Sequence, residues 1–451
     1  MKKLKLCIAG AAGTLVFALV HGAPSVYPTG TTTYDPDRAW SGYTVLSPLG
    51  EQAAVVIDMN GNVVKRWEGF NNSAGGPARI LPGGQVIGAV GSQPGQESVA
   101  LEQRDFDGNL IWRFDRNEQV TTRDGETIWS ARQHHDWQRE DMTAGSYSPG
   151  VTPAETGANM LILTHTTHRV DAVAEGRDLN DDRIIEVTPD GEIVWEWSAA
   201  LHIEEFGFSD AAREAIASGR AFGGGYDWIH LNSATWLGPN RRFDAGDERF
   251  DPRNIIVSSR TASLVAIIDR DSGSVVWQLG PDVTANPDTS AIRQIIGQHD
   301  AQMIAESLPG AGNILIFDNG GSSGFGPPSP IAPGGSGVYA RATSRILEID
   351  PVTFELVWSY DGPGFYALNI SGVQRLPNGN TLITEGPGGR LFEVTTEGEI
   401  VWEYIHPVYV GARESNSVYR AYRVPYGWIP QLQTPAELAV VPPSRGEFRV
   451  P

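Results

Sequence analysis

Cysteine is nearly absent from this chain, because Cys7 is the only one among 451 residues. It lies in an N-terminal segment that we expect to be removed, so the mature protein should contain no thiol. This excludes a disulfide framework, a thiolate metal site and a cysteine nucleophile. Positive charge is also scarce: 34 Lys and Arg stand against 54 Asp and Glu, which gives a net charge of −20. Because such a surface repels nucleic acid and anionic lipid, we expect no nucleic-acid partner, and an anionic substrate would need a local cationic pocket.

Long apolar runs are missing as well, except for residues 6–20 near the N-terminus. This run follows lysines within residues 2–5 and is short and rich in small side chains, which is typical of a secretory signal peptide. We therefore expect residues 1–23 to be a signal peptide and residues 24–451 to form a single periplasmic or secreted domain. An uncleaved membrane anchor is the alternative. Beyond export, the sequence predicts no membrane contact.

Motifs for nucleotide binding are absent, since the chain has no Walker loop, no dinucleotide fingerprint and no HExxH motif. Residues 320–324 match the pattern of a nucleophile elbow, but the Pro- and Gly-rich sequence after them favours a flexible lid. Asp178, Asn180 and Asp182 offer oxygen atoms at alternating positions, as calcium loops do. They lack the glycine and the distant glutamate of an EF-hand, so a solvated acidic turn is the other interpretation. We expect no required cofactor, and calcium at this segment is the one candidate.

What the chain does contain is a repeated motif of an acidic or turn residue, a glycine or its substitute, two aliphatic residues and then tryptophan. Adjacent tryptophans are spaced by about one or two times 40–45 residues, the period of a four-stranded propeller blade. Asp-Gly or Asn-Gly supplies the positive φ that a two-residue hairpin turn requires. The repeat predicts an all-β, six-bladed β-propeller whose tryptophans pack between blades. The six copies are Asp58–Trp67, Asp107–Trp112, Asp190–Trp195, Asp271–Trp277, Asp350–Trp358 and Glu397–Trp402.

A second repeat precedes the first and should form the inner strands that line the central channel. Insertions double three of the spacings, and they include residues 134–168, a helix-like stretch at 210–219 and a Gly/Pro/Ser segment at 320–337. Because insertions in a propeller lie on its faces, we expect them to wall or cover one mouth of the channel. The tail at 418–424 alternates as a strand does, and it is expected to close the ring with N-terminal residues.

Histidine is scarce, with nine in the chain, yet three of them share one position when the inner-strand copies are aligned. Because these strands face a common axis, the aligned side chains should form a cationic, donor-rich hole in an acidic molecule. The aligned position carries His135, His230, His299 and Ser371, and the far ends of the following strands carry His165, His168, Arg260 and Asn319.

Three interpretations of this cluster stay open at the level of the residues. The histidines could serve the fold alone by hydrogen bonding to neighbouring blades. They could bind zinc, copper or iron, although no carboxylate motif of the facial-triad type is evident and a nearby arginine would repel a dication. They could also act on a sulfuryl or phosphoryl group, with histidine as the nucleophile and Arg, His and Asn holding the equatorial oxygens.

Five short segments carry a further signal: HLNS at 230–233, SSR at 258–260, VWQLG at 276–280, QHDA at 298–301 and FDNG at 317–320. In this order they resemble the bacterial aryl-sulfate sulfotransferases, which are periplasmic six-bladed propellers. Members of that family move a sulfuryl group between phenols without a nucleotide sulfate donor. The likeness covers most of the mature chain. It implies that His299 is the nucleophile and that the supporting residues are His135, His230, Asn232 and Arg260.

The resemblance also implies a reaction. His299, held by Asp300 or a backbone group, would attack the sulfur of an aryl sulfate to give a sulfohistidine, and a phenolic acceptor would then take the group. Two alternatives remain: a hydrolase or lyase that uses the same pocket on another anion, and a propeller that binds an anion without turnover. Substrate contacts are expected from Asn232, Asn319, His165, His168 and Asp300.

Overall fold

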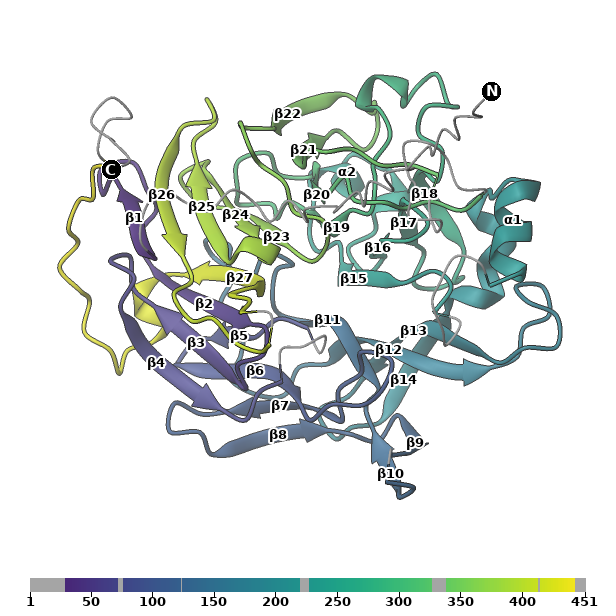
Figure 1. Cartoon of the computed structure of the whole chain (residues 1–451), viewed down its shortest axis with the longest axis horizontal. Helices are drawn as coiled ribbons and strands as arrows, with labels where there is room; N and C mark the ends of the chain where they lie inside the picture. Colours follow the sequence, from purple (N-terminus) through teal and green to yellow (C-terminus); the bar gives the residue numbers. More distant parts are fainter. Residues whose placement is uncertain are drawn as a thin grey trace, which may run out of the picture.

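Six antiparallel sheets surround a central axis in the computed structural model (Figure 1), which confirms the predicted six-bladed β-propeller. The structure describes residues 29–71, 76–122, 124–219, 227–326, 338–412 and 414–442. The predicted signal peptide lies outside these residues, as does the end of the Gly/Pro/Ser insertion from residue 327 to residue 337.

The first three blades occupy the N-terminal half of the chain, except that the inner strand of the first blade comes from the C-terminus. The first blade contains β27 (Val418–Val424), β2 (Tyr43–Pro48), β3 (Ala53–Ile57) and β4 (Val63–Glu68). The second contains β5 (Arg79–Leu81), β6 (Gln85–Val90), β7 (Ala100–Arg104) and β8 (Leu110–Phe114). The third contains β11 (Gln133–Arg139), β12 (Met160–His168), β13 (Leu179–Val187) and β14 (Ile193–Ser198).

The other three blades follow in chain order, and the sixth gains a fifth strand from the N-terminus. The fourth contains β15 (Leu231–Trp236), β16 (Ile255–Ser259), β17 (Leu264–Ile268) and β18 (Val275–Leu279). The fifth contains β19 (His299–Met303), β20 (Ile314–Asp318), β21 (Arg345–Ile349) and β22 (Leu356–Tyr360). The sixth contains β23 (Gly372–Arg375), β24 (Thr381–Glu385), β25 (Arg390–Val394), β26 (Ile400–Ile405) and β1 (Gly30–Tyr34).

Both ends of the chain close the ring, as the alternating tail at 418–424 predicts. β27 is the inner strand of the first blade and pairs with β2, so residues from the two ends of the described chain share one sheet. At the outer edge of the sixth blade, β1 pairs with β26. Because the sheet edges at the junction are occupied by both termini, the ring cannot open without breaking strand pairings.

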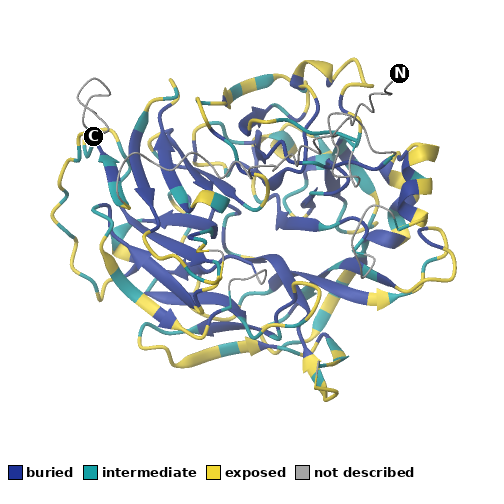
Figure 2. Ribbon diagram, viewed as in Figure 1, coloured by how far each residue is buried: buried dark blue, intermediate teal, exposed yellow. Residues whose placement is uncertain are grey.

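Burial follows the radial position of each strand. The inner strands β11, β15 and β19 are buried at every residue, whereas three of the five residues of the outer strand β8 are exposed. Figure 2 shows this gradient as a dark centre with a light rim. The core therefore lies between blades and around the axis.

Tryptophans tie each blade to the next, which confirms that the repeat serves packing between blades. In every blade an outer-strand indole N–H donates to a main-chain carbonyl in the turn of the following blade, at 2.8–2.9 Å. In the third blade Trp197 makes this bond and the motif residue Trp195 does not, since Trp195 lies under the guanidinium group of Arg270 instead. The six bonds run from Trp67, Trp112, Trp197, Trp277, Trp358 and Trp402 to Asp105, Pro189, Gly273, Pro351, Thr396 and Met59.

The helix-like insertion does form a helix, α1 (Asp210–Ala217), which Ser209 caps by accepting from the N–H of Ala212. Its apolar side packs into the core cluster shared by the third and fourth blades. It lies at the edge of the ring in Figure 1, so α1 does not cover the channel as we expected. None of the helices in the described ranges is long and apolar enough to cross a membrane.

The remaining elements are short and lie between strands of the blades. They comprise the hairpin β9 (Glu118–Thr121) and β10 (Thr127–Ser130), the helix α2 (Arg241–Asp244) and five single-turn or 3₁₀ segments. The 3₁₀ segments are η1 (Ala199–Phe206), η2 (Glu248–Phe250), η3 (Ser290–Ile292), η4 (Gly386–Gly388) and η5 (Tyr426–Trp428).

Candidate functional site

The inner strands begin at the site, and their pairing determines which of their residues are equivalent. In each of the third to sixth blades, the first residue of the second strand pairs with one residue of the inner strand. Counting four residues back from that inner-strand residue gives the equivalent position at the site. The sequence alignment is wrong in the fourth blade, where the pairing puts Asn232 and not His230 at this position; the register shifts near the site in the third, fourth and fifth blades. The equivalent residues are His135, Asn232, His299 and Ser371.

His299 stands at the start of β19 with one ring nitrogen fixed and the other available. Its Nδ1 lies 3.0 Å from the carbonyl oxygen of Gly297 and 2.8 Å from Oδ1 of Asn319. The amide of Asn319 donates to the carbonyl oxygens of Ala367 and Ile370, so its Oδ1 must face His299. Because both neighbours of Nδ1 are acceptors, Nδ1 carries the proton and the neutral ring has its lone pair on Nε2.

The surroundings of His299 favour this neutral form. Burial, assisted by the positive charge of Arg260, lowers the pKa of His299 well below the usual value of a histidine. A neutral imidazole with a free Nε2 lone pair is the form in which histidine acts as a nucleophile. The structure therefore leaves Nε2 as the nitrogen of His299 that carries the free lone pair.

His135 and His230 bring two further imidazoles to the same place. The ring of His135 stands edge-on to that of His230, with the ring centres 4.7 Å apart. Nδ1 of His135 lies 2.8 Å from Nδ1 of His134. Burial, with the charges of His230 and His299 after it, lowers the pKa of His135 well below its usual value. Hence the predicted trio of histidines does converge, although His230 does not occupy the strand position that His135 and His299 share.

His230 has an acidic partner that no motif in the sequence selects. Nδ1 of His230 lies 2.5 Å from Oδ2 of Asp227. Burial opposes ionisation of Asp227, but the neighbouring His230 lowers the pKa of this carboxyl overall. A carboxylate at Nδ1 orients the ring and supports a proton on Nε2, as in histidine–aspartate pairs that exchange protons with substrates.

Arg260 is the cation of the site. It follows β16, its N–H donates to the carbonyl oxygen of His230, and its side chain passes beside Gly297. Asp227 is the neighbouring carboxylate that acts on it electrostatically. Within the described ranges, no hydrogen bond or ion pair occupies its guanidinium group. Arg260 is half-buried and lies beside the histidines, so it supplies a cation at the place where the sequence predicts a cationic pocket.

Asp300 does not hold His299, contrary to one expectation. Its Oδ2 accepts from the N–H of Val373, and its Oδ1 lies 3.2 Å from a guanidinium nitrogen of Arg420. Asp136 sits at the equivalent position in the third blade, where it pairs with Arg79 at 3.0 Å and lies 3.4 Å from Arg420. These four charged residues, Arg79, Asp136, Asp300 and Arg420, come from different inner strands, and we call them the channel ion cluster.

The remaining predicted residues lie at different distances from His299. Asn232 donates to the carbonyl oxygen of Gln298, and its buried Oδ1 has no hydrogen-bond partner among the described residues. His165 stacks on His134 behind the trio, with the ring centres 3.8 Å apart. His168 lies near the surface and bonds to Asp181, which raises the pKa of His168. His168 therefore does not join the cluster at His299.

The comparison with known families agrees with this geometry. The family described as Arylsulfotransferase (ASST) matches residues 105–406, which is more than half of the chain. The chain belongs to the arylsulfotransferase family. No curated protein sequence is similar enough to count as a match.

Solved propellers resemble this arylsulfotransferase-family chain only distantly. A Bacteroides caccae protein of unknown function shows 10% identity and a TM-score of 0.44, covering 85% of this chain and 99% of its own. A virginiamycin B lyase from Staphylococcus aureus shows 11% identity and a TM-score of 0.37, with 86% of each chain covered. A streptogramin B lyase shows 12% identity and a TM-score of 0.38, covering 84% of this chain and 82% of its own. Similarity at this level says nothing about the substrate.

In this arylsulfotransferase-family chain the acidic segment at 178–182 is not the calcium loop that its sequence suggested. Asn180 and Asp182 lie in β13, where the backbone is extended. Asp178 is exposed and pairs with Arg169, while Oδ1 of Asn180 accepts from Arg132. Because each oxygen faces a different partner, the segment does not gather its ligands around one point. Of the three predicted ligands, only Asp182 is fully buried.

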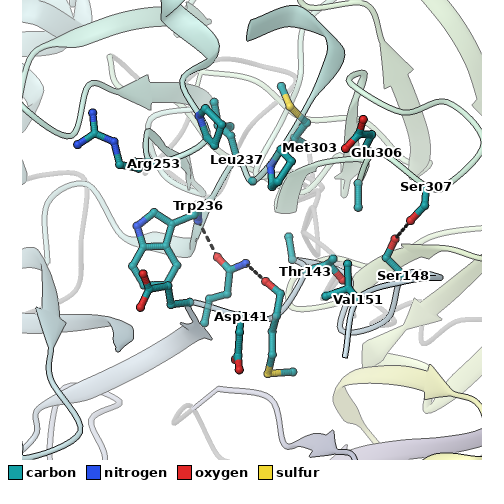
Figure 3. Close-up of a pocket in the computed structure, with 18 of the residues that line it drawn as sticks. Asp141, Thr143, Ser148, Val151, Trp236, Leu237, Arg253, Met303, Glu306 and Ser307 are labelled. Carbon is teal, nitrogen blue, oxygen red and sulfur yellow. Dashed lines mark hydrogen bonds between the residues drawn. The ribbon is translucent and has the colours of Figure 1, made fainter. Parts of the chain in front are cut away.

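A cavity lies at the other end of the inner strands (Figure 3). It has a volume of about 850 Å³ and is lined by Gln138, Trp236 and Met303, at or next to the last residues of β11, β15 and β19, and by none of the predicted site residues. The side chain of Gln138 bridges the N–H of Trp236 and the carbonyl oxygen of Met142. Four carboxylates, Glu140, Asp141, Glu186 and Glu306, line this cavity beside two arginines, Arg253 and Arg270, so its lining has an excess of negative charge that disfavours a sulfate ester.

Several residues in and around the candidate site had no clear signal in the sequence. Asp227 precedes His230 by three residues, so an acidic residue near a site histidine was the only hint. His134 directly precedes His135, and no pattern in the sequence marks it as part of a separate cluster. The channel ion cluster had no signal, because Arg79 and Arg420 lie in inner strands more than 300 residues apart.

Proposed function

We propose that this protein transfers a sulfuryl group from an aryl sulfate to a phenol, with Nε2 of His299 as the nucleophile. The observation that carries the proposal is the pair of acceptors at Nδ1, Gly297 and Asn319, which leaves the lone pair on Nε2. Membership of the arylsulfotransferase family supports the substrate class. The unpaired guanidinium group of Arg260 supports binding of the anionic ester.

The first half-reaction forms a nitrogen–sulfur bond and breaks the bond between sulfur and the aryl oxygen. Nε2 of His299 attacks sulfur in line with the departing phenolate, which takes the electron pair of the broken bond. Nε2 of His230, whose Nδ1 is held by Asp227, delivers a proton to that phenolate. His299 becomes a sulfoimidazolium, and the acceptors at its Nδ1–H stabilise the positive charge on the ring.

The second half-reaction is the reverse with a new phenol. His230 removes the proton of the acceptor hydroxyl, the phenol oxygen attacks sulfur, and the nitrogen–sulfur bond breaks to restore neutral His299. Arg260 balances the charge of the three sulfuryl oxygens, which is spread most widely in a loose transition state. His135 lies close enough to His230 to donate to one of these oxygens.

A double-displacement assay tests the proposal. Purified protein is incubated with 4-nitrophenyl sulfate in the absence and presence of a second phenol, and both nitrophenol release and intact mass are followed. We expect a burst of nitrophenol and a mass increase of one sulfuryl group without acceptor, and steady turnover with it. Turnover that needs water alone and leaves no adduct would instead support a hydrolase. Binding of the ester without release would support an anion-binding propeller.

Asn319 is a positioning residue for His299, and replacing it by aspartate should move the pH dependence. In Asn319→Asp a carboxylate would face Nδ1–H, stabilise the protonated ring and raise the pKa of His299. The wild-type enzyme should keep its kcat/KM well below pH 6.5, because its His299 stays neutral there. In the variant, the acidic limb of the kcat/KM profile should shift to higher pH by about 1–3 units. An unchanged limb would show that His299 does not control the profile.

A further inference from the structure

Behind the three histidines lies a second cluster, formed by His134, His165 and Asp182. Ligand atoms of these residues all lie within 4.8 Å of one another, and all three side chains are buried. Nε2 of His134 is 3.2 Å from Oδ1 of Asp182, and Nε2 of His165 is 3.9 Å from the same oxygen. The residues come from β11, β12 and β13, which are adjacent strands of the third blade.

The three facing atoms have no hydrogen-bond partner among the described residues, although they are fully buried. In each side chain the other polar atom is held in place. Nδ1 of His165 lies 3.1 Å from Oε1 of Glu97, and Oδ2 of Asp182 accepts from the N–H of Leu231 at 3.1 Å. Nδ1 of His134 is bonded to Nδ1 of His135. A buried polar atom without a partner is costly, so three of them facing one point call for a bound group.

We propose that His134, His165 and Asp182 bind a divalent transition-metal ion through Nε2, Nε2 and Oδ1. Two imidazoles and one carboxylate are a ligand set for Zn²⁺, Fe²⁺ or Mn²⁺. Ligands about 2.0–2.2 Å from such an ion lie about 3.3 Å apart at tetrahedral angles, close to the separations in this cluster. A carboxylate or another group bonded to the second ring nitrogen, as Glu97 is to His165, is the usual support of a metal-binding histidine.

The charges around the cluster suit a dication. Asp181 and Asp182 are buried and Asp227 is half-buried, and both Asp227 and Asp181 act electrostatically on Asp182. Arg132 is a neighbouring cation, but its guanidinium group is occupied by Glu97 and Glu118. The rings of His134 and His165 are stacked with their planes 17° apart, so they would have to tilt apart for both Nε2 atoms to point at one ion.

A metal at this place would also set the proton position of His135. With Nε2 of His134 bound to the ion, the proton of that ring stands on Nδ1 and donates to Nδ1 of His135. His135 then carries its own proton on Nε2, as a donor. The metal site itself does not depend on the proposed transferase reaction, since it is defined by the second cluster alone.

Metal content measured on purified full-length protein tests the inference. The protein is stripped with a chelator, loaded separately with Zn²⁺ and Mn²⁺, desalted and measured by elemental mass spectrometry. We expect about one equivalent of at least one of these ions per chain, with a higher Tm than the stripped protein. Loading with Co²⁺ should give visible absorption bands of nitrogen and oxygen ligation. A wild-type protein that retains no ion overturns the proposal.

Variants separate this site from adventitious binding. Asp182→Asn keeps an acceptor for Leu231 but loses the ligand charge, and His165→Gln removes one imidazole; each should lose at least about tenfold in affinity. His168→Gln is the matched control, because His168 lies on the same strand but bonds to Asp181. Equal metal content in all variants would overturn the proposal. So would a crystal structure of loaded protein with a water at this point, recognised by distances of about 2.7–3.2 Å to its neighbours.

Discussion

His299→Ala should lower the rate of sulfuryl transfer by about 10⁴-fold or more and abolish the sulfuryl adduct. The proposed reaction passes through a covalent bond to Nε2, so an alanine at this position leaves no group to carry the sulfuryl between donor and acceptor. Loss of a nucleophile that works together with a base and an anion-binding group costs rates of this order. Residual activity would come only from the ester held near Arg260. The measurement is kcat for nitrophenol release, together with intact mass after a single turnover.

A matched histidine variant makes this test specific. His202 stacks on Trp197 and bonds to Glu205, away from the site. His202→Gln should therefore keep the wild-type rate and adduct, and both variants should remain folded by circular dichroism. If His299→Ala still formed the adduct, the nucleophile would be another residue, with His135 and His230 as the next to be tested. If it kept full turnover without adduct, covalent catalysis would be ruled out.

Arg420→Met should destabilise the protein by about 3–5 kcal/mol, the largest effect on stability expected here. Arg420 is buried, and its guanidinium group serves Asp136, Asp300 and the carbonyl oxygen of Asn232. Methionine fills a similar volume but leaves buried carboxylates without their shared counter-charge. The ionised form of Asp300 should be destabilised most. Burial already raises the pKa of its carboxyl, and Arg420 is the group that opposes this effect.

Denaturant unfolding at neutral pH measures this loss of stability, and two further variants serve as comparisons. Arg253→Met removes an exposed arginine paired with Asp271 and should change the free energy of unfolding by about 0–1 kcal/mol. Adding Asp300→Asn to Arg420→Met should restore part of the loss, because an amide is cheaper to bury than an unpaired carboxylate. A loss below about 1 kcal/mol in Arg420→Met would show that the channel ion cluster is not needed to hold the inner strands together.

Most of the fold could be predicted from the repeat that is visible in the sequence. The position of each tryptophan follows from hairpin turns of fixed length, which are local features that a chain specifies without distant contacts. Closure by the 418–424 strand was also predictable, because a strand without a partner nearby needs one elsewhere. The misassignment of Trp195 and the register error at His230 share a cause: a shift or bulge of a residue or two leaves the pattern almost unchanged but moves a side chain to another neighbour.

The site was predictable only in part. Residue scarcity and family likeness selected His135, His299 and Arg260, which the structure brings to one place. They could not select Asp227 as the partner of His230, nor show that Asp300 faces Arg420 and that Asn319 faces Nδ1 of His299. Those contacts join different blades or depend on the direction of one side chain at a strand end. Such directions follow from packing and have no periodic trace in the sequence.

By itself, the sequence determined the number of blades, the closure of the ring, the acidic surface and the family to which the chain belongs. These depend on composition and on short repeats that every blade specifies for itself. Only the tertiary structure decided the protonated nitrogen of His299, the channel ion cluster and the meeting of His134, His165 and Asp182. The channel ion cluster joins side chains from four blades, whereas the other two depend on side-chain directions within one blade that packing decides. The charges and lone pairs of these side chains interact strongly because the side chains are buried close together. Their distances in the fold cannot be read from their spacing in the sequence.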